Sequence, residues 1–298
     1  MIAVLGSANM DVVTHVSRIP RPGETVQAEG SQRFPGGKGA NQAVAAARLG
    51  EDVIFCGKVG EDAFGEALLD ALRTDGIDTS NVEKAPGTPT GMAEILVDAT
   101  AENAIVYTPG ANALVDAAYV DRVFDALRAA HVILIQLEIP LPAIAHLLRR
   151  LPSHRPTVLL DPAPVQDLST LPLGRVDVLT PNATELAELT DEQDVAAAAH
   201  KLLDRGVRAV LCKMGTGGAY WFAGDAFHIP AYAVASVDTT AAGDAFNGAL
   251  ATAILSRPCR AAVAWACAAG AIATTALGAQ PSLPYLNAVE AFVAERAS

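Results

Sequence analysis

The stretch DTTAAGDAFNGAL (residues 238–250) places a carboxylate, Asp244, directly behind the small residues 241–243. The small and apolar residues that follow predict a helix over 242–255. Backbone N–H groups at a helix start have no partner within the helix, and together with the helix dipole they favour an anion such as phosphate. A carboxylate in the first turn can accept a proton from a hydroxyl that attacks a phosphoryl group. The alternative is an acid that only complements the helix dipole.

Outside this stretch, short apolar strands alternate with helical patterns. Strands are expected at 2–5, 53–56, 132–137, 158–160, 176–179 and 209–212. Helices are expected at 40–49, 64–73, 118–129, 196–205, 242–255, 260–276 and 286–296. Strands that are apolar on both faces and separated by helices predict a mostly parallel central sheet covered by helices. The fold class is therefore α/β.

Two segments, at about 11–35 and 90–109, interrupt the alternation. The first contains β-like runs at 12–16 and 24–28, and the second predicts a hairpin of 92–97 and 104–107. We interpret them as a small β-sheet inserted into a single catalytic domain that spans residues 1–298. A small sheet beside an open α/β sheet indicates a lid.

Composition excludes several classes of protein. The 298 residues carry a net charge of −12, which repels nucleic acid and anionic membranes. We find no signal peptide and no run of about 18 apolar residues that would cross a membrane. The scattered cysteines form no CxxC pair and predict a reducing, cytoplasmic location. They are Cys56, Cys212, Cys259 and Cys267.

Polar residues are expected where strands end, because ligands of open α/β sheets bind at the carboxyl ends of the strands. After the first strand, Asn9 and Asp11 suit vicinal hydroxyls, although a polar turn is the alternative. The absence of GxGxxG at this turn disfavours an NAD-dependent dehydrogenase. Glu138 follows a very apolar strand and needs a partner or water.

Three further stretches have both a structural and a functional interpretation. PGGKGANQ (35–42) is either a glycine turn or a sugar-binding helix start, and it is no Walker A loop because Gly follows the lysine. Asn182 and Glu185 have capping-box spacing, or they organise magnesium through water. The turn 213–218 is a hairpin, or a flexible wall for a nucleotide.

Together these motifs resemble the ribokinase-like (PfkB-type) carbohydrate kinases along essentially the whole chain. The N-terminal signature is GGKGANQAVAAARLG (36–50), the C-terminal one is DTTAAGDAFNGAL, and N-x-x-E lies at 182–185. NMD, PGETV, QLE and GAQPS also lie where ribose-specific members carry them. The resemblance implies a three-layer fold with a β-sheet lid, and ATP-dependent phosphoryl transfer to a sugar.

The resemblance also implies a role for each matched position. The base would be Asp244, with Ala241, Ala242 and Gly243 at the anion hole. The sugar would be bound by Asn9, Asp11, Gly37, Lys38, Asn41, Glu138 and Asp244. The nucleotide would be bound by Asn182, Lys213, Gly215, Thr216, Gly218, Gly243 and Cys267. Mg²⁺ would be organised by Glu185, and a monovalent cation, K⁺, by Asp238, Thr240, Ala273, Ala276, Gly278 and Ser282.

Three of these residues depart from the family pattern. Ala241 replaces a common glycine, Lys213 a common threonine, and Cys267 a frequent histidine, which puts the adenine contact in doubt.

The same residues narrow the substrate. Asp11 and Glu138 would repel a phosphate already on a sugar. A nucleobase needs apolar or aromatic surroundings, and the small sheet offers little of these beyond Phe34 and Tyr107. We therefore expect a neutral pentose, D-ribose, phosphorylated at its 5-hydroxyl. The alternatives are 2-deoxyribose, fructose or adenosine, or a sugar-binding relative without catalysis, against which the intact Asp244 argues. A homodimer through the lid is expected, as in relatives.

Overall fold

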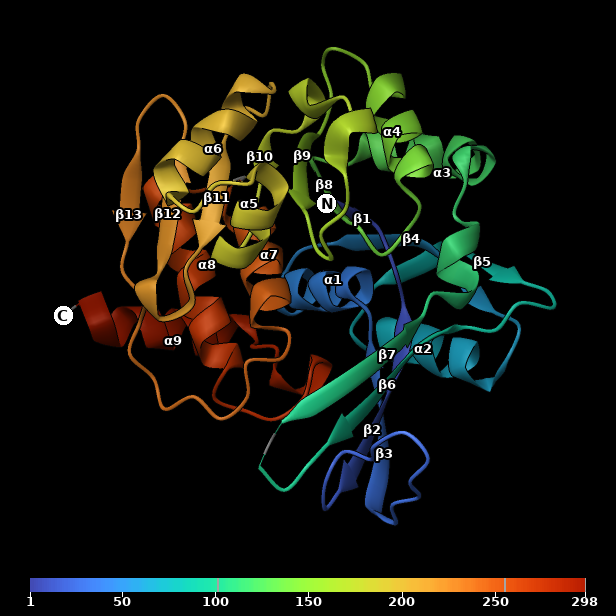
Figure 1. Ribbon diagram of the computed structural model, residues 1–298. Coiled ribbons are helices and arrows are strands. Elements are labelled where there is room, and N and C mark those ends of the chain that lie inside the picture. The colour runs from blue at the N-terminus through green and yellow to red at the C-terminus, as the bar shows by residue number, and fades with distance from the viewer. Residues whose placement is uncertain (101, 255, 298) are drawn as a thin grey trace.

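The computed structural model describes residues 1–100, 102–254 and 256–297 (Figure 1). Within these residues a nine-stranded sheet has the order β13-β12-β11-β10-β9-β8-β1-β4-β5. All neighbours from β11 to β5 pair in parallel, and β12 and β13 are antiparallel. The strands are β1 (Ile2–Leu5), β4 (Val53–Gly60), β5 (Asp78–Ala85), β8 (Val132–Gln136), β9 (Thr157–Asp161), β10 (Val178–Leu179), β11 (Val210–Lys213), β12 (Ala219–Phe222) and β13 (Phe227–Ile229).

Helices cover both faces of this sheet, as the apolar strands predict. The helices are α1 (Lys38–Arg48), α2 (Ala63–Thr74), α3 (Ala117–Ala129), α4 (Leu141–Arg150), α5 (Ala183–Thr190), α6 (Val195–Asp204), α7 (Ala242–Ala253), α8 (Cys259–Ala273) and α9 (Leu286–Ala297). Successive side chains of a strand point to opposite faces. Ile2 and Val4 accordingly pack in the core with α1, α2, α7 and α8. Ala3 and Leu5 pack in the core with α3, α4 and α6.

A separate small sheet is built from the two interrupting segments, and Figure 1 shows it projecting from the body near α1 and α2. Its order is β3 (Ala28–Gly36), β2 (Asn9–Val16), β6 (Gly91–Val97) and β7 (Asn103–Thr108). The predicted hairpin of β6 and β7 is confirmed, although Ala101 in its loop lies outside the described residues. The predicted strand over 24–28 is wrong. Glu24 instead closes a turn by accepting from the backbone N–H of Arg21, and β3 begins only at Ala28.

Two other predicted boundaries differ for local reasons. Helix α8 ends at Ala273 rather than at 276, because the Thr274 and Thr275 hydroxyls donate to carbonyls of its last turn. Strand β10 begins at Val178, since Val176 is hydrogen-bonded to Leu173 in a 3₁₀ turn. The helix predicted over 242–255 is described as far as residue 253, and Leu255 lies outside the described residues. None of the described helices is long and apolar enough to cross a membrane.

A buried ion pair joins two strands at the end of the sheet where the parallel strands begin. Arg155 precedes β9 and is 4% exposed, and its guanidinium bonds both carboxylate oxygens of Asp177, which precedes β10. Asp177 also accepts from the Val158 N–H at 2.8 Å and from the exposed Arg208 at 2.9 Å. The functional residues described below lie at the opposite end, where these strands finish.

Candidate active site

Helix α7 begins where the sequence predicts, and its first turn is the centre of the site. Ala241 is the N-cap residue, with a left-handed φ of 58°. This conformation costs a residue with a side chain about 1 kcal/mol, and glycine is the residue that adopts it most readily. The half-buried Gly243 follows, and then Asp244, whose side chain is only 6% exposed.

Two amides of α1 hold the Asp244 carboxylate. Asn41 Nδ2 donates to its Oδ2 at 3.0 Å, and Gln42 Nε2 donates to its Oδ1 at 3.1 Å. The two helices cross closely because α7 has Gly248 at the crossing, where a Cβ atom would lie 2.5 Å from the Cβ of Ala45. Glycine at position 248 therefore lets the two helices approach closely enough for the side-chain amides of Asn41 and Gln42 to reach Asp244.

Burial raises the pKa of Asp244 to about 6, with nearby Lys38 opposing the shift and Asp161 adding to it. A carboxylate with this pKa is ionised at neutral pH and is a stronger base than an exposed aspartate. The electrostatics therefore suit proton abstraction from an alcohol.

Glu138 has the partners that its place after an apolar strand requires. Its Oε2 accepts from Ser7 Oγ at 2.5 Å, from Asn9 Nδ2 at 3.2 Å and from the backbone N–H of Lys38 at 3.1 Å. The last bond satisfies a free donor at the start of α1. Glu138 thus joins the ends of β1 and β8 to the helix that carries Asn41.

Asn9 is fixed by a residue that the sequence did not indicate. Asn112 Nδ2 donates to Asn9 Oδ1 at 2.7 Å, and Asn112 Oδ1 accepts from the Ala8 N–H at 3.1 Å. Gly91 of β6 is required beside them, since a Cβ atom there would lie 2.2 Å from the Asn112 amide. The amide of Asn9 is held rigidly between the two sheets.

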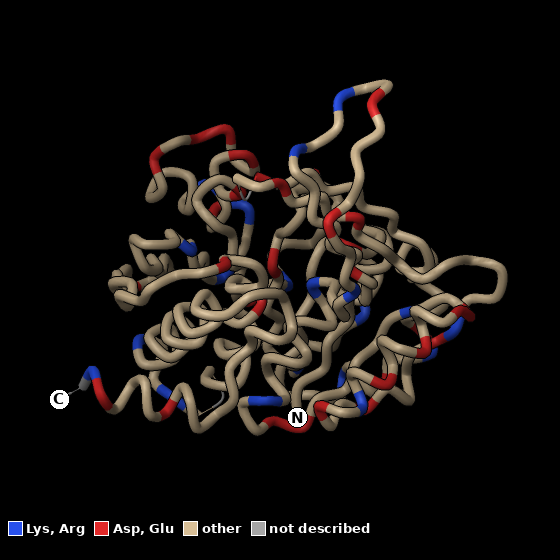
Figure 2. Tube along the Cα trace, turned by 90° about the horizontal axis from the view of Figure 1, so that it is seen from below, with Lys and Arg blue, Asp and Glu red and all other residues tan. Residues whose placement is uncertain are grey.

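The carboxyl groups of Asp11, Glu138 and Asp244 come from different parts of the chain and act on one another electrostatically. Asp11 of β2 lies against Gly36, where a Cβ atom would be 2.2 Å from its Oδ2. Burial and the charges of Glu138 and Asp244 raise the pKa of Asp11 to about 7. Burial disfavours the charged form of Lys38 and by itself would lower the pKa of this lysine. The surrounding carboxylates outweigh burial and hold the pKa of Lys38 above its usual range. Figure 2 shows acidic residues on many elements, in agreement with the net charge of −12. Lys38 therefore supplies a positive charge at the site of a protein that is acidic as a whole.

Replacing Asp11 with asparagine tests this crowding. A carboxyl whose folded pKa is raised binds a proton in the folded state, but not in the unfolded state, between about pH 4 and pH 7. Its contribution to the free energy of unfolding therefore falls as pH rises through this window. We expect Asp11→Asn to stabilise the ligand-free protein at pH 8 by on the order of 1–3 kcal/mol, and much less at pH 5. Urea unfolding at both pH values measures this, and an equal gain at both would contradict it.

The residues predicted for the nucleotide lie around β11. Asn182 and Glu185 form a reciprocal capping box at 2.8 and 2.7 Å, which confirms the structural interpretation of their spacing. Asn182 also bridges to Lys213, whose Nζ contacts Asp161 Oδ1 at 2.9 Å. The hairpin interpretation of 213–218 is confirmed, because β11 and β12 pair in antiparallel fashion across it.

Four other nucleotide candidates differ in their surroundings. Gly215 and Gly218 have φ of 54° and 86°, a conformation that favours glycine, and Thr216 between them is exposed. Cys267 of α8 is 9% exposed and lies in the hydrophobic core. Burial raises the pKa of its thiol to about 12, so it is protonated and unreactive at neutral pH.

The residues predicted for a monovalent cation also gather in one place. Asp238 Oδ1 accepts from the backbone N–H and hydroxyl of Thr240 at 2.9 and 2.6 Å, and its Oδ2 accepts from the Gly278 N–H at 2.9 Å. Ser282 lies in the same loop, with its hydroxyl bonded to a carbonyl at 2.9 Å. Ala273 ends α8 immediately before this loop, and Ala276 is part of it. One carboxylate and several carbonyl and hydroxyl oxygens are the donors that a hard cation takes.

Several residues of the site carry no assignment from the sequence. Gln42, Gln136, Asp161, Ser7 and Asn112 complete its hydrogen-bond network. Asp161 directly follows the apolar run 158–160, as Glu138 follows the apolar run 132–137, so the reasoning applied to Glu138 would have found it. Asn112 carries no comparable signal, because it comes from a 3₁₀ turn that only the fold brings to Asn9.

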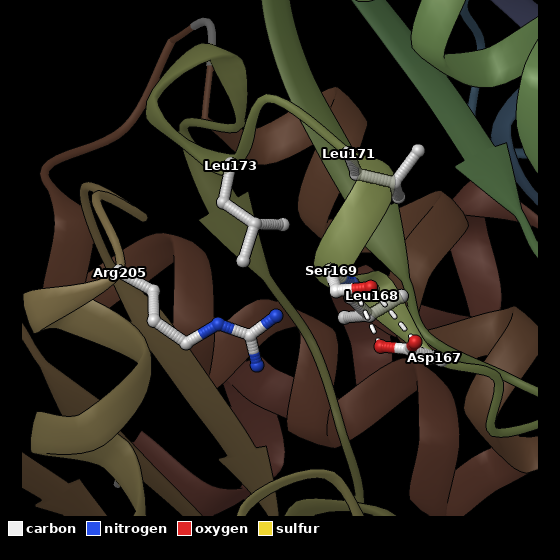
Figure 3. Close-up of a pocket in the computed structure, with 6 residues that line it drawn as sticks. All are labelled: Asp167, Leu168, Ser169, Leu171, Leu173 and Arg205. Atoms are coloured by element: carbon white, nitrogen blue, oxygen red, sulfur yellow. Dashed lines mark hydrogen bonds between the residues drawn. The ribbon is translucent and has the colours of Figure 1, made fainter.

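A surface hollow elsewhere on the molecule shares no residue with this site. It has a volume of about 510 Å³. It is lined by Asp167, Leu168, Ser169, Leu171, Leu173 and Arg205 (Figure 3). Asp167 already accepts from the backbone and hydroxyl of Ser169, at 2.8 and 2.7 Å.

Comparison with known proteins decides the family. The sequence pattern of the pfkB family carbohydrate kinases matches residues 1–286. This chain belongs to the pfkB family of carbohydrate kinases. The kinase is 38% identical over 294 residues to a deoxyribokinase of Salmonella typhi, covering 96% of each chain. It is 40% identical over 306 residues to a ribokinase of Schizosaccharomyces pombe, covering 97% of this chain and 96% of the relative.

Solved structures agree with this assignment. A ribokinase of Arabidopsis thaliana, complexed with ribose and ATP, superimposes with a TM-score of 0.92 at 31% identity, covering 98% of each chain. The kinase therefore has the ribokinase-like α/β fold, with a large sheet, flanking helices and a separate small sheet. It is a sugar kinase of the ribokinase type, a phosphotransferase that acts on an alcohol group.

Proposed function

We propose that this kinase transfers the γ-phosphoryl group of ATP to the 5-hydroxyl of D-ribose, with Asp244 as the base. The observation that carries the proposal is the buried Asp244 in the first turn of α7, held by Asn41 and Gln42 beside the helix start. The ribose and ATP of the Arabidopsis thaliana relative support the choice of both substrates.

In the proposed reaction the 5-hydroxyl oxygen of ribose attacks the γ-phosphorus in line. The new oxygen–phosphorus bond forms as the bond to the β-phosphate oxygen breaks, and ADP leaves. The hydroxyl proton passes to the Asp244 carboxylate. The backbone N–H groups of Ala241 and Gly243 at the start of α7 stabilise the charge on the transferring group, whereas the N–H of Ala242 donates to the Thr239 carbonyl at 3.2 Å. The small sheet, acting as a lid, excludes water that would otherwise compete as acceptor.

Sugar recognition is assigned to the groups that face the small sheet. Asp11, Glu138 and Asn9 offer acceptors and donors for several hydroxyls, with Gly37, Lys38 and Asn41 at the start of α1. Three carboxylates near one lysine favour a neutral sugar over a phosphorylated one.

The nucleotide and cations are assigned to the other half of the site. Asn182, Lys213, Gly243 and the 215–218 turn would contact ATP, with Cys267 near the adenine. Glu185 would organise Mg²⁺ through water, since its Oε1 is not used by the capping box. The Asp238 loop would hold K⁺. Bound magnesium supplies positive charge to the phosphates.

The experiment compares ribose with 2-deoxyribose first, because the similar proteins include both ribokinases and a deoxyribokinase. The test is coupled ADP release over ribose, 2-deoxyribose, fructose, fructose 6-phosphate and adenosine, with and without potassium. We expect the highest kcat/KM for ribose. A higher value for deoxyribose would reassign the substrate, and no turnover with any alcohol would overturn the reaction.

A homodimer through the small sheet is the proposed assembly. Ile105 and Val106 of its edge strand are 58% and 62% exposed, which is unusual for large apolar side chains. Strand edges with such residues favour pairing with a second copy. Sedimentation velocity would show a dimer for the unaltered protein and a monomer for Val106→Glu. A monomer in both would contradict this assembly.

A further inference from the structure

One buried carboxylate of the site has no role in the assignments above. Asp161 is the last residue of β9 and is 3% exposed. Its Oδ1 accepts from Lys213 Nζ at 2.9 Å, and its Oδ2 accepts from Gln42 Nε2 at 2.9 Å. Both oxygens are therefore engaged, one by a cation and the other by an amide.

Gln42 connects this carboxylate to the proposed base. The same Nε2 that donates to Asp161 also donates to Asp244 Oδ1, at 3.1 Å. Gln136 Nε2 donates to Gln42 Oε1 at 2.6 Å, and this bond directs the nitrogen end of the Gln42 amide toward the two acids. Asp161 and Asp244 consequently share one donor, and their charges lie close together.

Lys213 lies where the nucleotide phosphates are expected. Its Nζ is 3.6 Å from the position that a Cβ atom on Gly243 would occupy, directly beside the first turn of α7. Its side chain is 14% exposed, and its ammonium pairs with Asp161. If the pair were broken, this ammonium would lose its carboxylate beside the first turn of α7, which carries Asp244, and a positive charge closer to Asp244 would lower the basicity of that acid.

We propose that Asp161 is a positioning residue for phosphoryl transfer, which holds the Lys213 ammonium at the start of α7 for the transferring phosphate and orients Asp244 through Gln42. The inference rests on the proposed function, because it takes Asp244 as the base and α7 as the phosphate site. Asp161 also keeps the ammonium away from the base until a phosphate oxygen shares it.

The alternative is that the ion pair only joins β9 to β11. Two variants, one that removes a negative charge and one that removes a positive charge, distinguish a role in catalysis from a role in the fold. The charged groups around Asp244 are Lys38 of α1, Asp161 of β9 and Asp11 of β2, with Lys213 and Glu138 adjoining. Removing the negative charge of Asp161 should weaken the base, whereas removing the positive charge of Lys213 should strengthen it.

The experiment measures kcat, the KM of each substrate and the pH profile of kcat/KM for the unaltered kinase, Asp161→Asn, Lys213→Met and the double variant. Asp161→Asn should lower kcat roughly 10- to 100-fold with little change in the KM for sugar, because the base and the ammonium are both displaced. The acid limb of the kcat/KM profile of Asp161→Asn should move to lower pH. Lys213→Met should raise the KM for ATP about tenfold and move the acid limb to higher pH. The double variant should return the limb toward that of the unaltered kinase.

Asp177→Asn is the matched control, a partly buried acid of an ion pair at the opposite end of the sheet. It should lower Tm without moving the pH profile. If Asp161→Asn and Lys213→Met lower Tm but leave the acid limb and kcat unchanged, as this control does, the pair only supports the fold and the inference is wrong. Turnover by the unaltered kinase tests the proposed function separately, and its failure with every sugar would overturn both.

Discussion

Asp244→Asn is expected to lower kcat by about 10²- to 10⁴-fold, the range that a positioned general base contributes. Asparagine has nearly the same shape, and its Oδ1 can still accept from an amide of α1, so the helix crossing should persist. It has no lone pair basic enough to take the proton of the attacking hydroxyl. Steady-state kinetics give kcat, and calorimetric titration with ribose should show an affinity within a few-fold of that of the unaltered kinase.

A second first-turn acid provides the control for this prediction. Glu66 lies in the first turn of α2 and is exposed, where it pairs with Lys84. It complements a helix dipole without facing the site, so Glu66→Gln should leave kcat unchanged. If Asp244→Asn behaves like Glu66→Gln, the dipole interpretation of Asp244 is correct and the base assignment is refuted.

Asp177→Ala is expected to lower the free energy of unfolding by about 3–5 kcal/mol, because it leaves the buried guanidinium of Arg155 without its carboxylate. The Val158 N–H loses its acceptor in the same change. Urea unfolding monitored by circular dichroism measures the effect. The kcat of the folded fraction should not change, since this ion pair lies at the opposite end of the sheet from the site.

Arg208→Ala gives the contrasting case. Arg208 bonds the same carboxylate but is 67% exposed, and an ion pair at the surface contributes at most about 1 kcal/mol. Equal losses for Asp177→Ala and Arg208→Ala would mean that burial of Arg155 does not set the cost.

The sequence alone determined the fold class, the small sheet and the place where α7 begins. Runs that are apolar on both faces predicted a parallel sheet between helices, because such strands are stable only when both faces are covered. Small residues before Asp244 predicted the start of α7, and the departure from alternation predicted the small sheet. Each of these signals is local, so it can be recognised within about fifteen residues of chain.

Only the tertiary structure decided which groups touch. The contacts of Asp244 with Asn41 and Gln42, and those of Asp161 with Gln42 and Lys213, join residues far apart in the chain. The contacts of Asp244 depend on how closely α1 crosses α7, and packing at Gly248 allows that close approach, whereas those of Asp161 depend on how β9 lies beside α1 and β11. No periodicity or motif records a distance between two helices. The carboxylate that we propose as the base could therefore be recognised in the sequence, whereas its contacts with Asn41 and Gln42 required the packed core.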